Sequence, residues 1–352
     1  MAACRQIGAA CRQMGAACGP GWQSTYCRAM KKALIRPARI DDAETIARMA
    51  SALSRAEGEP APRFDAAICR RDGFGDKPCF KAWIAEVEGR VAGYVLHHRS
   101  YDTDRVARAE WLCDLYVESW ARNQDLGRRL VRWVARQAAA DGASALHWTV
   151  LRRNAAARRF YRRFAREDER LLHCLVEGKD LMRLGSVAPV SDALIRPARA
   201  DDAALLARML GELLDALGEP AFDFDAATRI LADGFGPAPR FQAIIAERND
   251  AVAGYALFWP IYDSEAGCPA LFLSDLMVVE AARGGGIARD LMHRVALHAR
   301  EAGFAQVIWE VLEGNIRARA FYRKIARESD KAVVVTCADE DFRRLVAEAA
   351  QD

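Results

Sequence analysis

The chain repeats itself over most of its length, and this long period constrains the fold more than any local motif. The segment ALIRPARIDDAETIARM, which starts at Ala33, returns 160 residues later as ALIRPARADDAALLARM. Between residues 33–67 and 193–227, 23 of 35 positions are identical. A unit of about 155 residues has the size of a whole domain rather than that of a solenoid repeat. We therefore expect two homologous domains in tandem.

Small and turn-forming residues mark the junction of the two units, in the stretch GSVAPVSD. We expect a first domain over residues 31–185, a linker over 186–191 and a second domain over 192–352. Residues 1–30 contain Cys and Gln at heptad spacing, but these residues lack the apolar pairing of a coiled coil. We expect this segment to be a disordered extension.

Each unit mixes helical and strand patterns. In the second unit, apolar residues spaced by four follow Asp201 and Asp202, which predicts an amphipathic helix with an aspartate at its N-cap. The runs FQAIIAE, AVAGYALFWPIY and PALFLSDLMVV are separated by turn residues and predict an antiparallel meander. After RGGGIA we expect a helix that stops at Gly303, then a buried strand and a short helix capped by Asn315. The fold class is therefore α+β, with a mixed, mostly antiparallel sheet flanked by helices in each domain.

Composition excludes several classes of partner. Lys and Arg number 51 against 48 Asp and Glu, so a net charge of +3 gives little reason to expect a nucleic-acid partner. The arginines at 152–166 are interpreted as a solvated face, with a phosphate or nucleic-acid site as the alternative. No apolar run reaches the roughly 18 residues of a membrane helix, so we expect no membrane partner. The ten cysteines show no C-x-x-C spacing, which favours a reduced, cytoplasmic protein without a metal.

Three consecutive glycines, at 284–286, join an apolar run to a predicted helix. Such a turn presents unpaired backbone N–H groups at the positive end of a helix dipole, which suits a phosphate. The loop lacks the Lys-Ser/Thr of a P-loop and the third glycine of a dinucleotide fingerprint, so alone it leaves a plain tight turn as the alternative. The first unit has RNQDLG in the same frame, with Asp125 where Gly286 stands.

The pattern LMVVEAARGGGIA, followed by a helix, a strand, VLEGN and FY, resembles the GNAT acyltransferase family. Arg283, Gly286 and Ala288 meet that family's motif Arg/Gln-x-x-Gly-x-Gly/Ala. The short motifs IRPA, DGFG, YD and VLEGN…FY resemble those of the diamine N-acetyltransferases of spermidine/spermine or thialysine type. The resemblance covers nearly all of each unit. It implies transfer of acetyl from acetyl-CoA, as co-substrate, to a primary amine by direct attack.

The resemblance also implies which residues hold the coenzyme. The loop amides would bind its pyrophosphate, the preceding strand would pair its backbone with pantetheine, and an asparagine would contact it further on. The residues expected to bind the coenzyme are Leu276, Met277, Val278, Arg283, Gly284, Gly285, Gly286, Ile287, Ala288 and Asn315.

The chemistry needs a proton acceptor for the ammonium group and an acid for the leaving thiolate. Tyr322 matches the tyrosine that the family uses as this acid, with helix packing as its alternative role. Ser274 stands where the subgroup usually has its glutamate base, so the base is expected to be Asp275, Glu310 or a water chain. Burial of Glu310 would raise its pKa towards a useful value, whereas on a sheet edge it would point to solvent. Asp263 and Asp275 match acidic positions that bind the cationic amine; the alternative for Asp263 is a surface carboxylate.

The two units are expected to differ in activity. If the first loop keeps the path of the second, the Asp125 carboxylate faces the pyrophosphate and weakens binding by about a hundredfold. We therefore expect the second domain to acetylate a small-molecule amine. The first domain would act as a degenerate partner in an intramolecular pseudo-dimer, which would leave the whole chain a monomer. The alternatives are a non-catalytic acyl-CoA or amine sensor, a scaffold, or a protein-lysine acetyltransferase.

Overall fold

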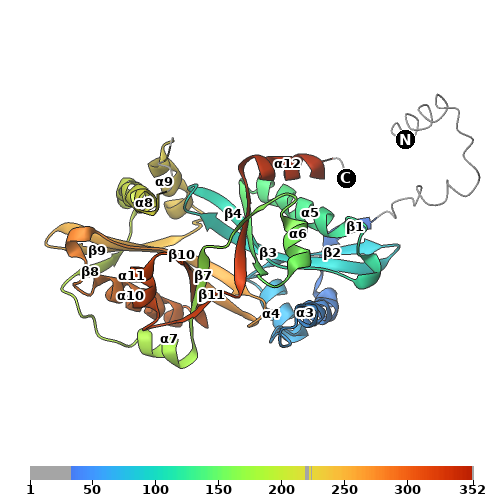
Figure 1. The fold of residues 1–352 in the computed structure, drawn as a ribbon, viewed down its shortest axis with the longest axis horizontal. Helices are drawn as coiled ribbons and strands as arrows, with labels where there is room; N and C mark the ends of the chain where they lie inside the picture. The colour runs from blue at the N-terminus through green and yellow to red at the C-terminus, as the bar shows by residue number, and fades with distance from the viewer. Residues whose placement is uncertain (1–32, 219–221, 223, 351–352) are drawn as a thin grey trace, which may run out of the picture.

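The computed structural model describes residues 33–218, 222 and 224–350, so the extension expected over residues 1–30 lies outside the described residues. The described chain forms two seven-stranded sheets, one for each unit, with helices packed against them (Figure 1). Both sheets are mixed and mostly antiparallel. The α+β fold expected from the sequence is confirmed.

The first sheet has the strand order β1-β2-β3-β4-β5-β14-β6. Its neighbouring strands are antiparallel except for β4 and β5, which are parallel. The strands of the first unit in this sheet are β1 (Ala33–Pro37), β2 (Lys81–Val87), β3 (Arg90–Asp102), β4 (Ala107–Val117), β5 (Ala145–Leu151) and β6 (Arg166–Asp168).

The second sheet has the order β13-β7-β12-β11-β10-β9-β8, with β11 and β12 as its parallel pair. The expected meander is present as β9, β10 and β11. The strands of the second unit in this sheet are β8 (Leu194–Pro197), β9 (Gln242–Arg248), β10 (Ala251–Asp263), β11 (Cys268–Val278), β12 (Gln306–Leu312) and β13 (Arg327–Ser329).

Each unit inserts one strand into the sheet of the other. Strand β7 (Leu171–Glu177) of the first unit lies between β12 and β13, and β14 (Ala332–Ala338) of the second lies between β5 and β6. Every second residue of these strands belongs to the core of the opposite unit. Each sheet therefore contains strands from both sequence ranges, 31–185 and 192–352. The residues buried across the exchange are Leu172, Cys174 and Val176 in one direction and Val333, Val335 and Cys337 in the other.

The helices follow the same exchange. Helix α12, drawn in red in Figure 1, packs on α5 of the first unit, and α7 packs on α10 of the second. The first unit contributes α3 (Ala43–Glu57), α4 (Ala66–Phe74), α5 (Leu126–Ala140), α6 (Ala155–Tyr161) and α7 (Gly178–Leu184). The second contributes α8 (Ala203–Leu217), α9 (Ala226–Phe235), α10 (Ile287–Glu301), α11 (Ile316–Tyr322) and α12 (Asp339–Ala349).

Two helix caps bear on the sequence predictions. Asn315 caps α11 as expected, because its side chain accepts a hydrogen bond from the amide of Ala318 at 3.1 Å. Asp202 stands at the N-cap of α8, but its side chain makes no capping bond to that helix. Its carboxylate instead binds the Arg196 guanidinium and the Arg199 amide. The aspartate expected at the N-cap is therefore confirmed as Asp202, while its carboxylate binds a charged donor and a preceding amide instead of the first turn of α8.

The two units also interlock through their β-hairpin tips. Tyr101 and Val106, from the hairpin of β3 and β4, are buried in the core that includes α8 and α9. Tyr262 of β10 packs on the rings of Phe64 and Phe80 in the first unit, with ring centroids 6.1 and 4.7 Å away. These contacts bring the end of each hairpin to the partner unit's central strands.

None of the helices in the described part of the chain is both long and apolar enough to span a membrane. All six cysteines within the described residues are free thiols.

Candidate active site

A cavity of about 1790 Å³ lies between the units and is lined by residues of both. Its two ends are related by the internal repeat, because equivalent residues of each unit line them. The lining includes Asp275, Glu310, Asn315 and Tyr322 from the second unit, and Asp114, Thr149, Asn154 and Tyr161 from the first.

The second-unit end of the cavity begins where two strands separate. Strands β11 and β12 pair only from Leu271 to Leu273, opposite residues 307–309. Ser274 is an extra residue in β11, since Leu257 pairs with Asp275 and the next residue of β10 pairs with Leu273. Such a β-bulge changes the direction of side chains and is common beside active sites. Glu310 thus directly follows the last residue of β12 that pairs with β11, and Asp275 follows the last such residue of β11 after the bulged Ser274.

Asp275 is a buried carboxyl with an unused acceptor. It is 6% exposed, and its Oδ2 has no hydrogen-bond partner within the described residues. Burial raises the pKa of Asp275 to about 7, the charge of Asp104 adds to this rise, and the hydroxyls of Ser274 and Thr103 oppose it. A carboxyl that titrates near neutral pH suits the removal of a proton from an ammonium group.

Glu310 lies inside the second sheet, between β11 and the inserted strand β7. Its side chain is 16% exposed, so it does not extend into solvent from a sheet edge. Burial raises the pKa of Glu310 to about 8, with smaller contributions from Asp104 and Asp168. Its Oε1 lies 3.5 Å from Nδ1 of His173.

Tyr322 is placed so that it can act as an acid and also pack in the core, which are the two roles considered from the sequence. Its ring packs edge-on against Trp309, with centroids 5.1 Å apart, and the residue is 8% exposed. Burial raises the pKa of the phenol well above its usual value, so it keeps its proton at neutral pH. A protonated phenol that lines the cavity can serve as an acid while its ring packs in the core.

The glycine loop and its degenerate counterpart follow the same backbone path. Gly284 and Gly286 have φ of 85° and 87°, and Asn123 and Asp125 have φ of 60° and 58°. Left-handed backbone costs energy for residues with a Cβ, though Asn and Asp tolerate it better than most. The backbones of the two loops therefore follow a similar path, which is the condition under which Asp125 would repel the pyrophosphate.

The charge of Asp125 is partly compensated. Its carboxylate lies 3.0 Å from the guanidinium of Arg132, which also lies 3.5 Å from Glu348. Since an opposite charge nearby reduces the field felt by a bound phosphate, the repulsion at the first loop is weaker than an isolated carboxylate would give.

The first-unit end of the cavity differs in its polar groups. Asp114, the counterpart of Asp275, accepts hydrogen bonds at both oxygens: from Tyr94 Oη at 2.6 Å and from Ser264 Oγ at 2.7 Å. Thr149 stands on β5 where β12 has Glu310. The buried carboxylate of the first unit is thus satisfied, whereas that of the second is not.

Asp263 lines the same cavity as Asp275, the other predicted substrate residue, but its carboxylate is already hydrogen-bonded. Its Oδ1 accepts from the amides of Glu265 and Ala266 at 2.9 Å, and its Oδ2 accepts from Gln306. Its charge raises the pKa of Asp114 in the first unit and not that of Asp275. The structure thus uses this carboxylate to form a turn near the first-unit end of the cavity.

The comparison with known families agrees with this geometry. The acetyltransferase (GNAT) family model matches residues 46–165 and again residues 209–326. The chain belongs to the GNAT family. It is therefore an acyltransferase with two GNAT domains in tandem, as the resemblance implied.

Relatives of this GNAT protein include acetyltransferases of small amines. Thialysine N-epsilon-acetyltransferase of Sus scrofa is 30% identical over 154 residues, which are 41% of this chain and 89% of the relative. Spermidine/spermine N(1)-acetyltransferase-like protein 1 of Homo sapiens is 35% identical over 115 residues, which are 29% of this chain and 16% of the relative. A tandem GNAT protein from the clavulanic acid biosynthesis pathway covers 87% of this chain and 98% of its own, with 15% identity and a TM-score of 0.47.

GNAT proteins use acetyl-CoA, and the second unit has the features that such a ligand needs. Residues 276–278 pair with β10 on one side only, since the pairing with β12 ends at Leu273. Open space surrounds the position that a Cβ of Gly284 would take, so its backbone is accessible to a phosphate. The cavity lining includes Asn123 and Asp125 of the first loop, but it includes no residue of the second-unit segment 277–288. The glycine loop of the second unit therefore faces outside this cavity.

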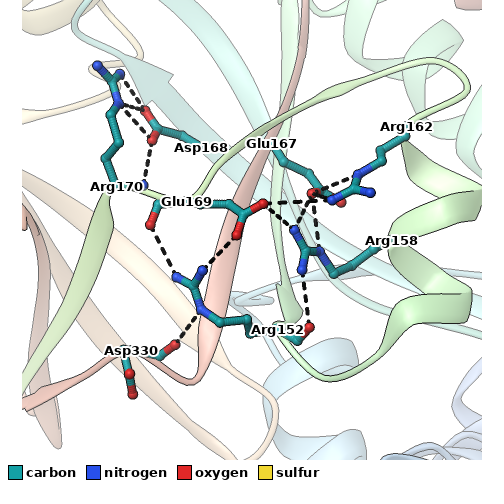
Figure 2. A network of polar contacts seen from close by, with 8 residues as sticks. All are labelled: Arg152, Arg158, Arg162, Glu167, Asp168, Glu169, Arg170 and Asp330. Atoms are coloured by element: carbon teal, nitrogen blue, oxygen red, sulfur yellow. Dashed lines mark hydrogen bonds and ion pairs between the residues drawn. The ribbon is translucent and has the colours of Figure 1, made fainter.

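The arginine-rich stretch of the GNAT chain is paired with nearby acids. Arg158 and Arg162 bind Glu167 at 2.6 and 2.7 Å, and Arg152 binds Glu169 at 2.8 Å (Figure 2). In the second unit Arg319 and Arg323 bind Glu328 in the same way. These arginines therefore balance the acidic residues that follow them.

Two residues near Asp275 and Glu310 gave no signal in the sequence. Thr103 and His173 both belong to the first unit, yet they lie against the second-unit end of the cavity. Within the described residues, no group of three or more His, Cys, Asp and Glu is placed to hold a metal ion.

Proposed function

We propose that the second unit transfers acetyl from acetyl-CoA to the primary amine of a small molecule by direct attack. One observation carries the assignment to the second unit. Asp275 Oδ2 and Glu310 Oε1 are buried polar atoms without a hydrogen-bond partner in the described chain, whereas both oxygens of Asp114 are bonded. Folded proteins rarely leave buried polar atoms unpaired outside functional sites.

The coenzyme would be held by three parts of the second unit. The free backbone edge of residues 276–278 would pair with pantetheine, and the amides of residues 283–288 would bind the pyrophosphate. Asn315 lies at the cavity wall and would contact the coenzyme while it caps α11. When bound, acetyl-CoA supplies an activated acyl group.

The residues of the chain would move two protons. Asp275 or Glu310 accepts the proton of the ammonium group, since their pKa values of about 7 and 8 allow both uptake and release near neutral pH. Tyr322 keeps its own proton because burial raises its pKa, and it donates that proton to the sulfur that leaves. Asp275 also attracts the cationic amine before its proton is removed.

The position of the site favours a small acceptor over a protein lysine. Asp275 and Glu310 lie in a cavity between two units, with Thr103 and His173 of the first unit beside them. The names of the relatives point to amines of the thialysine and polyamine kind. The interlocked first unit would complete an intramolecular pseudo-dimer, so that one chain acts without a second copy.

Release of coenzyme A thiol tests the function. Wild-type protein should release the thiol from acetyl-CoA with at least one small amine of a panel that contains spermidine, thialysine and a lysine-containing peptide. The double variant Asp275→Asn/Glu310→Gln should bind acetyl-CoA but release thiol at least about a hundredfold more slowly. Binding of acetyl-CoA without thiol release from any amine would instead support the sensor, and release only with the peptide would support a protein-lysine acetyltransferase.

A further inference from the structure

The exchanged strand β7 brings a histidine to the second-unit site. In the antiparallel pairing of β12 with β7, Glu310 stands directly opposite His173. Side chains directly opposite each other in an antiparallel pair share a face and lie close enough to interact. The histidine comes from the first unit, so neither unit alone contains this pair.

The two side chains form a buried acid–base pair. Nδ1 of His173 lies 3.5 Å from Oε1 of Glu310, and the side chains are 18% and 16% exposed. Nε2 of His173 is buried and has no hydrogen-bond partner in the described part of the chain. Both residues line the cavity. An imidazole with one nitrogen towards the carboxyl and the other unpaired can hold a proton at either side.

The start of β7 is fixed in place by the polar network of Figure 2. Arg152 binds the side chain of Glu169 at 2.8 Å and its carbonyl oxygen at 3.1 Å. The Glu313 amide of the second unit donates to the carbonyl oxygen of Arg170 at 2.7 Å. These contacts tie the segment before β7 to both units, and His173 follows three residues after Arg170.

The equivalent place in the first sheet has no such pair. There Val334 of the exchanged strand β14 stands opposite Thr149 of β5. Neither side chain can take up a proton at neutral pH. The acid–base pair therefore lies in the second sheet, which also carries Asp275 with its unpaired oxygen.

We propose that His173 is a positioning residue for Glu310, supplied by the first unit to the active site of the second. The inference rests on the proposed function. In the reaction, the ammonium group gives one proton to the Glu310 carboxylate, which frees the nitrogen lone pair for attack. The carboxylic acid so formed donates a hydrogen bond to Nδ1 of His173. The proton then passes to the imidazole and leaves by way of the cavity that His173 lines, and the carboxylate is restored.

The charges around the pair come from several elements. Asp104 from the hairpin between β3 and β4 and Asp168 from β6 raise the pKa of Glu310, in addition to burial. Burial and the charge of Arg152 together lower the pKa of His173 to about 4. Near neutral pH the pair therefore holds one proton, on the Glu310 carboxyl beside a neutral imidazole, and the carboxylate that accepts the substrate proton becomes the main form as pH rises through about 8.

Replacement of His173 in the full chain tests the proposal. His173→Gln keeps a donor of similar size but cannot relay a proton. We expect kcat to fall by about tenfold or more, a part of the roughly 10²–10⁴-fold that general base catalysis provides. The Michaelis constant for acetyl-CoA should be unchanged, and the pH profile of kcat should lose the limb that belongs to the pair. Thr336→Val is the control, because Thr336 of β14 makes a polar contact from the other exchanged strand, 3.1 Å from His147, two residues beyond the position equivalent to His173.

Equal kcat and equal pH profiles for wild type and His173→Gln, with similar melting temperatures, would overturn the proposal and leave the proposed function intact. A second measurement needs no turnover. The imidazole of His173, followed by NMR, should titrate differently in wild type and in Glu310→Gln. Identical titrations would show that the two residues are not coupled. Wild type that binds acetyl-CoA but acetylates no amine would overturn the proposed function, while the NMR titration would still decide whether the pair exists.

Discussion

The hydroxyl groups of Thr103 and Ser274 lie 2.9 Å apart, although the two residues belong to opposite units and are separated by 171 positions in the chain. Ser274 is the bulged residue of β11, directly before Asp275. The first unit thus contacts the strand that carries a proton acceptor of the second. This contact gives the first unit a direct influence on the ionisation of Asp275.

Thr103→Val should shift the pH dependence of the reaction. The Thr103 hydroxyl lowers the pKa of Asp275, so its removal should raise that pKa further above its present value of about 7. Since the carboxylate is the active form, the rising limb of kcat/KM against pH should move to higher pH. Ser264→Ala removes the equivalent hydroxyl, which binds Asp114, and serves as the control. A profile that does not move would show that Thr103 has no effect on the base.

Asp275→Asn should stabilise the protein at alkaline pH. The pKa of Asp275 is about 7 in the folded state and about 4 in the unfolded state. Between these pH values the folded protein therefore keeps a proton on Asp275 that the unfolded protein has lost. The stability of the wild type therefore falls as pH rises from about 4 to 7, and the amide removes this loss. Thermal unfolding at pH 5 and pH 8 should show a larger gain at pH 8. Asp114→Asn, which disturbs bonds from Tyr94 and Ser264, should lower the melting temperature at both pH values. An equal effect of Asp275→Asn at both pH values would contradict the assigned pKa.

Tyr322→Phe should separate the acid role of this residue from its packing. The phenylalanine keeps the ring contact with Trp309, so stability should change little. We expect kcat to fall by about a hundredfold, because the proton for the leaving sulfur is lost. Tyr161→Phe makes the same change beside Trp148 in the first unit and should leave kcat unaltered. Comparable losses in the two variants would place catalysis in both units.

Calorimetric titration of acetyl-CoA should give one site per chain, and Gly284→Asp should weaken it by about tenfold or more. Gly284 suits this test better than Gly286, because a Cβ at Gly286 would lie 2.6 Å from the Val190 side chain, whereas Gly284 faces open space. Gly284→Asn is the matched control, since Asn123 already adopts this backbone conformation in the first loop. Two sites per chain would show that the first loop tolerates its carboxylate.

Local signals predicted the repeated units, the meander and the asparagine cap. They could not predict the strand exchange, because β7 and β14 both bury their second, fourth and sixth residues, so this pattern does not assign either strand to one sheet. His173 and Thr103 gave no signal for the same reason, since their roles depend on the other unit. For Asp263 no sequence signal indicated that the amides of its own turn bind one carboxylate oxygen, and its role towards the substrate stays a prediction.

The exchange of β7 and β14 also has a consequence for biosynthesis. During translation, β5 and β6 of the first sheet are made early, but the strand between them ends only at Ala338. At roughly 5–20 residues per second, this strand leaves the ribosome at least several seconds after β6. Until then the nascent first domain has an open seam in its sheet and an unpaired β7. The first sheet therefore reaches its native strand order only after β14 of the second unit has been synthesised.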